Sequence, residues 1–282
     1  MILGRLRGHQ DKGSLAGALV KGGLVVVKAG KLLLALASFA AYAFLFTWQF
    51  AVIIVGMLVI HECGHLRCMK HYGMKTRGIY LIPLLGAAAV AEDNFPSRRA
   101  EATIALAGPL TGAVLAAGTG LVYFATRDGA FAAAAAWMAL INLFNLLPVV
   151  PLDGGRVVKS ITCSIGSRTG LAALIAGMLL GAVLAFTADL WIFVILIPLG
   201  LLDYLYDRHQ TNRAGRRDRR QAGRHARTET GADIPAAKPP LSPRASQAAF
   251  ACYAGLAILL WLFMLAMGHQ PGAVAAMHAL QG

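Results

Sequence analysis

The sequence from residue 50 to residue 69 reads FAVIIVGMLVIHECGHLRCM. A bilayer core of about 30 Å needs roughly 17–25 predominantly apolar residues in a crossing helix, so this stretch predicts a transmembrane helix. Its inner half carries the string HECGH, from His61 to His65, directly after the uncharged run 51–60. Ionisable side chains at membrane depth are costly to bury and usually serve a function. The stretch therefore predicts a functional site inside the membrane.

The HECGH string has the spacing of a zinc site. His61 and His65 are four residues apart and share one face of a helix, so both imidazoles can bind one Zn²⁺. Glu62 lies beside them and can take a proton from an attacking water. The alternative is that these polar side chains only bond neighbouring helices.

The whole chain has the composition of a polytopic membrane protein. Of its 282 residues, 57% are hydrophobic and 14% are charged, whereas soluble domains carry about 25% charged residues. The run 32–60 is interrupted only at Thr47, Trp48 and Gln49. A single helix from 32 to 69 would be about 57 Å long, so two helices joined by a tight turn are predicted. We predict an all-α fold of about seven transmembrane helices at 32–48, 50–69, 102–126, 130–150, 169–188, 190–206 and 248–268.

The positive charge follows this topology. The chain has 26 Lys and Arg against 13 Asp and Glu. If the N-terminus is cytoplasmic, only Arg127 among the 26 basic residues falls outside, as the positive-inside rule predicts. The run 216–220 contains four arginines but no aromatic residues for base stacking, so a solvated segment near anionic lipid is favoured over nucleic-acid binding.

These boundaries divide the chain into five parts. We expect a basic cytoplasmic segment at 1–31 and a transmembrane domain at 32–206 that carries the zinc motif, with its core at about 50–165. A basic, disordered cytoplasmic linker is predicted at 207–247 and an extra transmembrane helix at 248–268, followed by an external tail at 269–282. A multi-pass protein of a bacterial-type plasma membrane is expected, with the N-terminus and the active-site side cytoplasmic.

A catalytic zinc needs a third protein ligand and an open position for water. His71 is six residues beyond His65, about 240° around the helix, and the other histidines lie in tails or the linker. Asp153 is the stronger candidate, because it ends the string NLLPVVPLD at 145–153 and is followed by two glycines. Proline removes helical hydrogen bonds, so the helix is expected to unwind and direct Asp153 into a cavity. An ordinary helix end with a capping Asp is the alternative.

The two strings together resemble the site-2 proteases, zinc metalloproteases that cut within membranes. The resemblance rests on HECGH at 61–65 and on Asn145, Pro148 and PLDG at 151–154 in a later span. It covers roughly residues 45–165 and implies a three-helix catalytic core. It also implies one Zn²⁺ held by His61, His65 and Asp153, with Glu62 as general base. Asn145 would contact the substrate or the developing oxyanion, or else bond a neighbouring helix.

The function implied is regulated intramembrane proteolysis of a single-span membrane protein within the lipid bilayer. A helical substrate hides its carbonyls and must unwind. Residues 78–91 are apolar, too short to span, and broken by Pro83 and Gly86. We predict a membrane-embedded β-hairpin or loop there that offers a strand edge to an extended substrate, with a plain re-entrant loop as the alternative.

Three other functions remain open. A metal-ion transporter could use the same three side chains, although no repeated half-structure is visible in the sequence. A different membrane metallopeptidase would need a downstream Glu ligand. A non-catalytic membrane scaffold could retain the motif. The sequence leaves the oligomeric state open, and neither a PDZ nor a CBS domain fits in the longest soluble segment, which has 41 residues.

Overall fold

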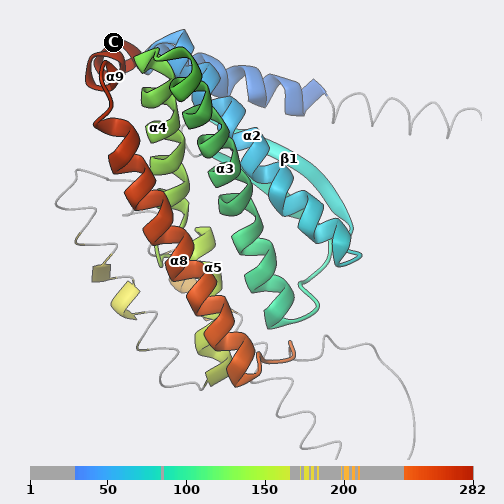
Figure 1. The fold of residues 1–282 in the computed structure, drawn as a ribbon. Coiled ribbons are helices and arrows are strands. Elements are labelled where there is room, and N and C mark those ends of the chain that lie inside the picture. Colours follow the sequence, from blue (N-terminus) through green and yellow to red (C-terminus); the bar gives the residue numbers. More distant parts are fainter. Residues whose placement is uncertain are drawn as a thin grey trace, which may run out of the picture.

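The computed structural model describes residues 29–83, 86–165 and 238–281, with scattered helical positions between 172 and 209. These parts are mostly helical and include one two-stranded sheet (Figure 1). The first helix is Ala29–Leu45. The other elements are α2 (Trp48–His71), β1 (Thr76–Ile82), β2 (Gly86–Ala91), α3 (Arg98–Thr126), α4 (Gly129–Asn145), α5 (Asp153–Ile165), α8 (Pro243–Gly268) and α9 (Ala273–Gln281).

Three of the described helices are long and apolar enough to cross a membrane, namely α2, α3 and α8. Ala29–Leu45 and α4 are apolar but shorter. Large apolar side chains cover the outward faces, with Val114 of α3 67% exposed and Leu259 of α8 61% exposed. Such surfaces are typical of contact with lipid. The predicted spans 169–188 and 190–206 lie largely outside the described residues, so seven spans remain a prediction.

The turn at residues 46–47 confirms the predicted break between the first two helices. Thr47 adopts an extended conformation and caps α2, its side chain accepting a hydrogen bond from the Phe50 N–H. The Thr47 hydroxyl also donates to the Leu280 carbonyl oxygen at 2.7 Å. Leu280 belongs to α9, so the predicted external tail contains a helix that packs back on this end of the bundle.

The predicted hairpin is present at residues 76–91. Strands β1 and β2 pair antiparallel, with Ile82 opposite Gly86 at the turn. Gly86 has a φ of +102°, a conformation that costs glycine little because it lacks a Cβ. The sheet lies alongside α2 (Figure 1), and β2 is the strand with more contacts to that helix.

The end of the predicted disordered linker is ordered in the structure. Helix α8 begins at Pro243, capped by Ser242, and not at residue 248. The Lys238 Nζ lies 3.0 Å from a carboxylate oxygen of Glu101, which is 3% exposed. Arg98 also pairs with Glu101, at 3.1 Å. Burying a carboxylate is costly unless cationic side chains pair with it. The ion pair with Glu101 therefore holds Lys238 against the start of α3.

The additional helix α8 is part of the packed core. Its buried Leu260 and Met267 pack against α4, and its Tyr253 hydroxyl donates to the Leu146 carbonyl oxygen at 2.7 Å. Leu146 directly follows α4 and opens the non-helical segment that leads to Asp153. Helix α8 therefore braces the segment that carries the predicted third ligand.

Candidate metal centre

The three predicted metal ligands meet at one buried point. The His61 Nε2 lies 3.0 Å from the Asp153 Oδ2, and the His65 Nε2 lies 3.2 Å from the same oxygen. The two Nε2 atoms are 3.1 Å apart. Each of the three residues is at most 8% exposed. Among the described residues, these three form the group of side chains that could hold a metal ion.

The spacing of these atoms fits a tetrahedral zinc ion. Zinc binds histidine nitrogen and carboxylate oxygen at about 2.0–2.2 Å, so two ligand atoms of a tetrahedron are separated by about 3.3–3.6 Å. The observed separations of 3.0–3.2 Å lie just below this range, so a small outward shift of the three side chains would accommodate the ion. Two imidazoles and one carboxylate also form the ligand class of catalytic zinc sites, which keep one position open.

Hydrogen bonds to the far side of each imidazole orient its free nitrogen toward the centre. The His61 Nδ1 lies 3.0 Å from the Asn142 Oδ1, and the Asn142 Nδ2 donates to the Met138 carbonyl oxygen. The amide oxygen of Asn142 therefore accepts the Nδ1–H of His61. The His65 Nδ1 donates likewise to the Ile104 carbonyl oxygen at 2.7 Å. Both Nε2 atoms then present lone pairs beside a carboxylate, an arrangement that favours a cation between them.

Glycines on α3 make room for this centre. A Cβ on Gly108 would lie 2.2 Å from the His65 Nε2 and 2.6 Å from the His61 Nε2. A Cβ on Gly112 would lie 2.2 Å from the Asn142 Oδ1. Residues 108–112 read GPLTG, a G-x-x-x-G string of the kind that lets membrane helices approach closely. Here Gly108 faces the two histidine ligands on α2, and Gly112 faces Asn142 on α4.

We expect Gly108→Ala to lower the zinc affinity of the purified protein at least tenfold, because the new methyl group occupies the place of both ligand nitrogens. A loss of this size is what displacing ligand-orienting contacts typically costs. Gly118→Ala on the same helix is the matched control, since nothing lies within 4 Å of its added Cβ. Competition with a chelator measures both affinities, and equal values would contradict the geometry.

Asp153 reaches the centre through the predicted break in the helical path. Helix α4 ends at Asn145, and Asp153 is the first residue of α5. A Cβ on Gly154 would lie 2.0 Å from the Leu146 carbonyl oxygen, and one on Gly155 would lie 2.3 Å from the Val149 carbonyl carbon. The two glycines therefore let the start of α5 fold back tightly on residues 146–150.

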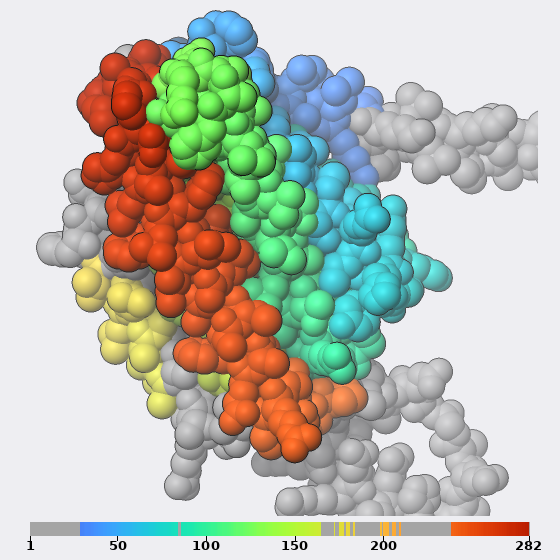
Figure 2. Space-filling view, viewed as in Figure 1, coloured from blue at the N-terminus to red at the C-terminus, as the bar shows by residue number. Residues whose placement is uncertain are grey.

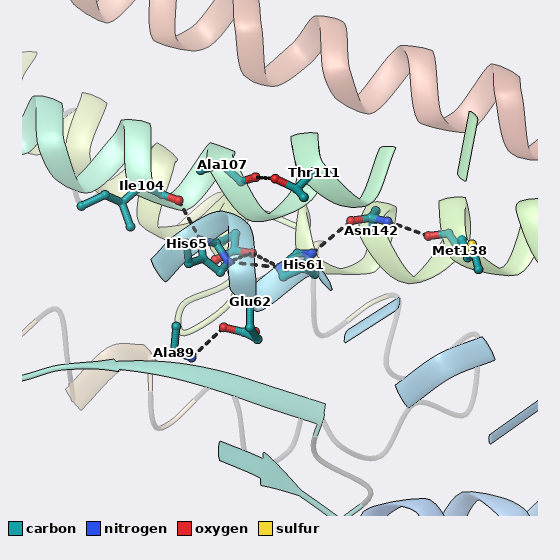
Figure 3. Close-up of polar contacts among 10 residues, drawn as sticks. His61, Glu62, His65, Ala89, Ile104, Ala107, Thr111, Met138 and Asn142 are labelled. Atoms are coloured by element: carbon teal, nitrogen blue, oxygen red, sulfur yellow. Dashed lines mark hydrogen bonds and ion pairs between the residues drawn. The ribbon is translucent and has the colours of Figure 1, made fainter. Parts of the chain in front are cut away.

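Glu62 extends from the same helix toward the hairpin (Figure 3). Its Oε2 accepts a hydrogen bond from the Ala89 N–H of β2 at 2.6 Å, and the residue is 6% exposed. His61 and His65 reach Asn142 and Ile104 on the side of α3 and α4 (Figure 3). The general-base candidate thus lies between the ligand cluster and the edge of strand β2.

The structure brings Asn142, and not Asn145, into hydrogen-bond contact with the described ligand cluster. Asn145 is the last residue of α4 and is half-buried. Sequence reasoning missed Asn142, although it lies three residues before Asn145, near the end of the same apolar helix. The sequence does contain a signal for Asn142, because an amide side chain at membrane depth needs a hydrogen-bond partner.

We expect Asn142→Ala to weaken zinc binding about 10–100-fold, the usual effect of losing a partner that orients a ligand. Without the amide oxygen, the His61 Nδ1–H loses its acceptor and the ring is free to turn. Asn145→Ala is the control and should retain the affinity of the unmodified protein. The same chelator competition measures both variants, and a loss confined to Asn145→Ala would reverse these assignments.

Comparison with known proteins agrees with this centre. Residues 49–128 match peptidase family M50. This match supports membership of the site-2 protease family for the part of the chain that it covers. The matched range contains both histidines, Glu62, the hairpin and α3, but it ends before Asp153. Zinc is therefore the metal expected at the cluster.

Individual relatives match over part of their length. The zinc metalloprotease MJ0392 of Methanocaldococcus jannaschii is 28% identical over 155 residues, which are 48% of this chain and 44% of the relative. The protein Rip3 of Mycobacterium tuberculosis is 31% identical over 162 residues, 47% of this chain and 41% of the relative. Stage IV sporulation protein FB of Bacillus subtilis is 25% identical over 169 residues, 54% of this chain and 57% of the relative. The matches thus span about half of the length of these relatives.

Proposed function

We propose that the protein is a zinc-dependent endopeptidase that hydrolyses a peptide bond within or near a transmembrane segment of a membrane protein. The proposal is carried by the convergence of three ligand atoms, two of them on α2, the same helix as Glu62, which is apolar enough to cross a membrane. His61 lies 13 residues after the start of α2 at Trp48, about 20 Å along the helix axis. The chemistry would take place below the membrane surface, in a cavity that water reaches.

Each site residue has a distinct proposed role. His61, His65 and Asp153 would hold the zinc, and Glu62 would take the proton of the attacking water and pass it to the leaving amine. When bound, zinc supplies a Lewis acid that polarises the substrate carbonyl and lowers the pKa of water toward 7. Asn145 remains our candidate for contact with the substrate or the oxyanion, because it lies at the end of α4 one helical turn beyond Asn142.

The outer edge of β2 is the proposed place for the substrate backbone. The Ala89 N–H bonds Glu62 and so points away from β1. Because backbone groups of alternate residues point to the same edge, Ala87 also presents its polar groups outward. An extended substrate that added to this edge would lie beside Glu62 with its carbonyls exposed. The substrate would thus be unwound where it is cut.

The proposed topology keeps seven spans, with the N-terminus and the open side of the centre in the cytoplasm. The end of α2 at His71 and the starts of α3 and α8 carry basic residues, including Lys70, Arg99 and Arg244. The far end of α3 carries Arg127, the one basic residue that this topology places outside. A single-span membrane protein in a bacterial-type plasma membrane is the substrate class that this arrangement suits.

Reconstitution tests this function against metal transport. The purified protein is placed in liposomes with a single-span reporter, and cleavage is followed by mass spectrometry while zinc flux is followed with an internal dye. We expect cleavage of the reporter within or next to its membrane segment. Zinc flux that depends on Asp153, without any cleavage, would favour the transporter instead.

A further inference from the structure

A groove runs between α3 and α8 on the outer face of the helical bundle. Its volume is about 930 Å³, and its walls are mostly apolar. Helices α3 and α8 lie on the face shown in Figure 2. Helix α3 contributes Leu106 and Leu110, and α8 contributes Ala249, Cys252 and Gly255. The small side chains of α8 leave the space open, and nothing lies within 4 Å of a Cβ added to Gly255.

Two arginines stand at one end of this groove. Arg99 is the second residue of α3 and Arg244 is the second residue of α8, and both line the groove and are exposed. Within the described part of the chain, neither guanidinium forms an ion pair, and no acidic side chain lines the groove. The two helices also begin here, and their N-terminal dipoles add to the attraction for an anion. The charge at this end therefore complements a phosphate group.

The depth of the groove corresponds to one leaflet of a bilayer. Its lining runs from Arg99 to Leu110 on α3 and from Arg244 to Leu259 on α8, about 16 Å and about 22 Å along the two helix axes. One leaflet of a bilayer that measures about 40–45 Å with its headgroup regions is about 20–22 Å thick. A partner helix that crossed the membrane would need a path about twice as long. The length of the groove and the two arginines at its end together fit a lipid with one anionic headgroup.

We propose that this groove binds an anionic glycerophospholipid, with its phosphate on Arg99 and Arg244 and an acyl chain along Leu106, Leu110 and Gly255. The site is separate from the metal centre but shares α3 with it. Ala107 lines the groove, and the adjacent Gly108 packs against both histidine ligands. A lipid in the groove would therefore support the helix that lies against the zinc ligands.

Native mass spectrometry of the detergent-purified full chain tests the headgroup contact. We expect the protein to retain phosphatidylglycerol about tenfold more than phosphatidylcholine, and Arg99→Gln/Arg244→Gln to remove this preference. Lys70→Gln/Lys75→Gln is the matched control. It removes two exposed positive charges from outside the groove and should keep the preference. Equal retention of both lipids, or an equal loss in both double variants, would overturn the proposal.

A second variant tests the apolar part of the groove without changing its charge. Gly255→Phe fills the open space beneath the arginines, so phosphatidylglycerol retention should fall about tenfold while zinc content stays unchanged. Undiminished retention would show that the acyl chain lies elsewhere and would overturn the proposal.

The occupant in native membranes can be captured directly. A photoreactive phenylalanine analogue in place of the exposed groove residue Leu259 should crosslink to phospholipid. Crosslinking to a transmembrane helix of another protein instead would assign the groove to a protein partner and contradict the lipid site.

Discussion

The Glu62→Gln variant is expected to bind zinc as the unmodified protein does and to lose peptide-bond cleavage. Glutamine keeps the shape of the side chain and can still accept the hydrogen bond from the Ala89 N–H. It cannot take a proton from water, and loss of a general base typically lowers the rate about 10²–10⁴-fold. The rate of reporter cleavage in liposomes measures the effect.

Zinc content measured on the same preparations separates this loss from a damaged centre. Full zinc with cleavage reduced at least 100-fold agrees with the role of Glu62 as general base. Equal cleavage by Glu62→Gln and the unmodified protein would remove Glu62 from the mechanism and would contradict the proposed protease activity of this site.

Asp153→Asn is expected to lower zinc affinity more than 100-fold. The carboxylate is the only anionic ligand of the three described residues in the cluster, and a neutral amide binds zinc poorly. Loss of a residue that only orients a ligand already costs about 10–100-fold, so loss of a direct ligand should cost more. Isothermal titration or chelator competition gives the affinity.

Asp128→Asn is the matched control for this change. Asp128 caps the start of α4, at the end of that helix far from the segment that leads to Asp153. Asn caps a helix as well as Asp does. Its zinc affinity should equal that of the unmodified protein. If Asp153→Asn also retained full zinc, Asp153 would not be a ligand and the cluster would need another third donor.

Much of the centre follows from spacing along the chain. His61 and His65 share a helix face because they are four residues apart, and the structure confirms that their Nε2 atoms meet. The prolines and glycines around Asp153 predicted a break in the helix, and the structure places that residue at the start of a new one. Gly86 and Pro83 likewise predicted the hairpin. In each case local backbone chemistry determines the result.

Other features depend on how helices turn relative to one another, which one sequence does not specify. Asn142 and Asn145 have the same chemistry, and only the rotation of α4 against α2 brings the former to His61. The ordered residues before α8 depend on a buried Glu101 that lies 137 positions away from Lys238. Helix α9 forms where Leu280 meets Thr47, 233 positions apart. These contacts are set by tertiary packing.

The most direct measurement of the central claim compares zinc-stripped and zinc-reloaded protein in liposomes that contain the single-span reporter. The account predicts no cleavage after chelation, recovery on addition of about one equivalent of zinc, and no recovery in a His65→Ala variant. Cleavage that persists in the stripped protein, or that zinc restores equally in His65→Ala, would contradict the account.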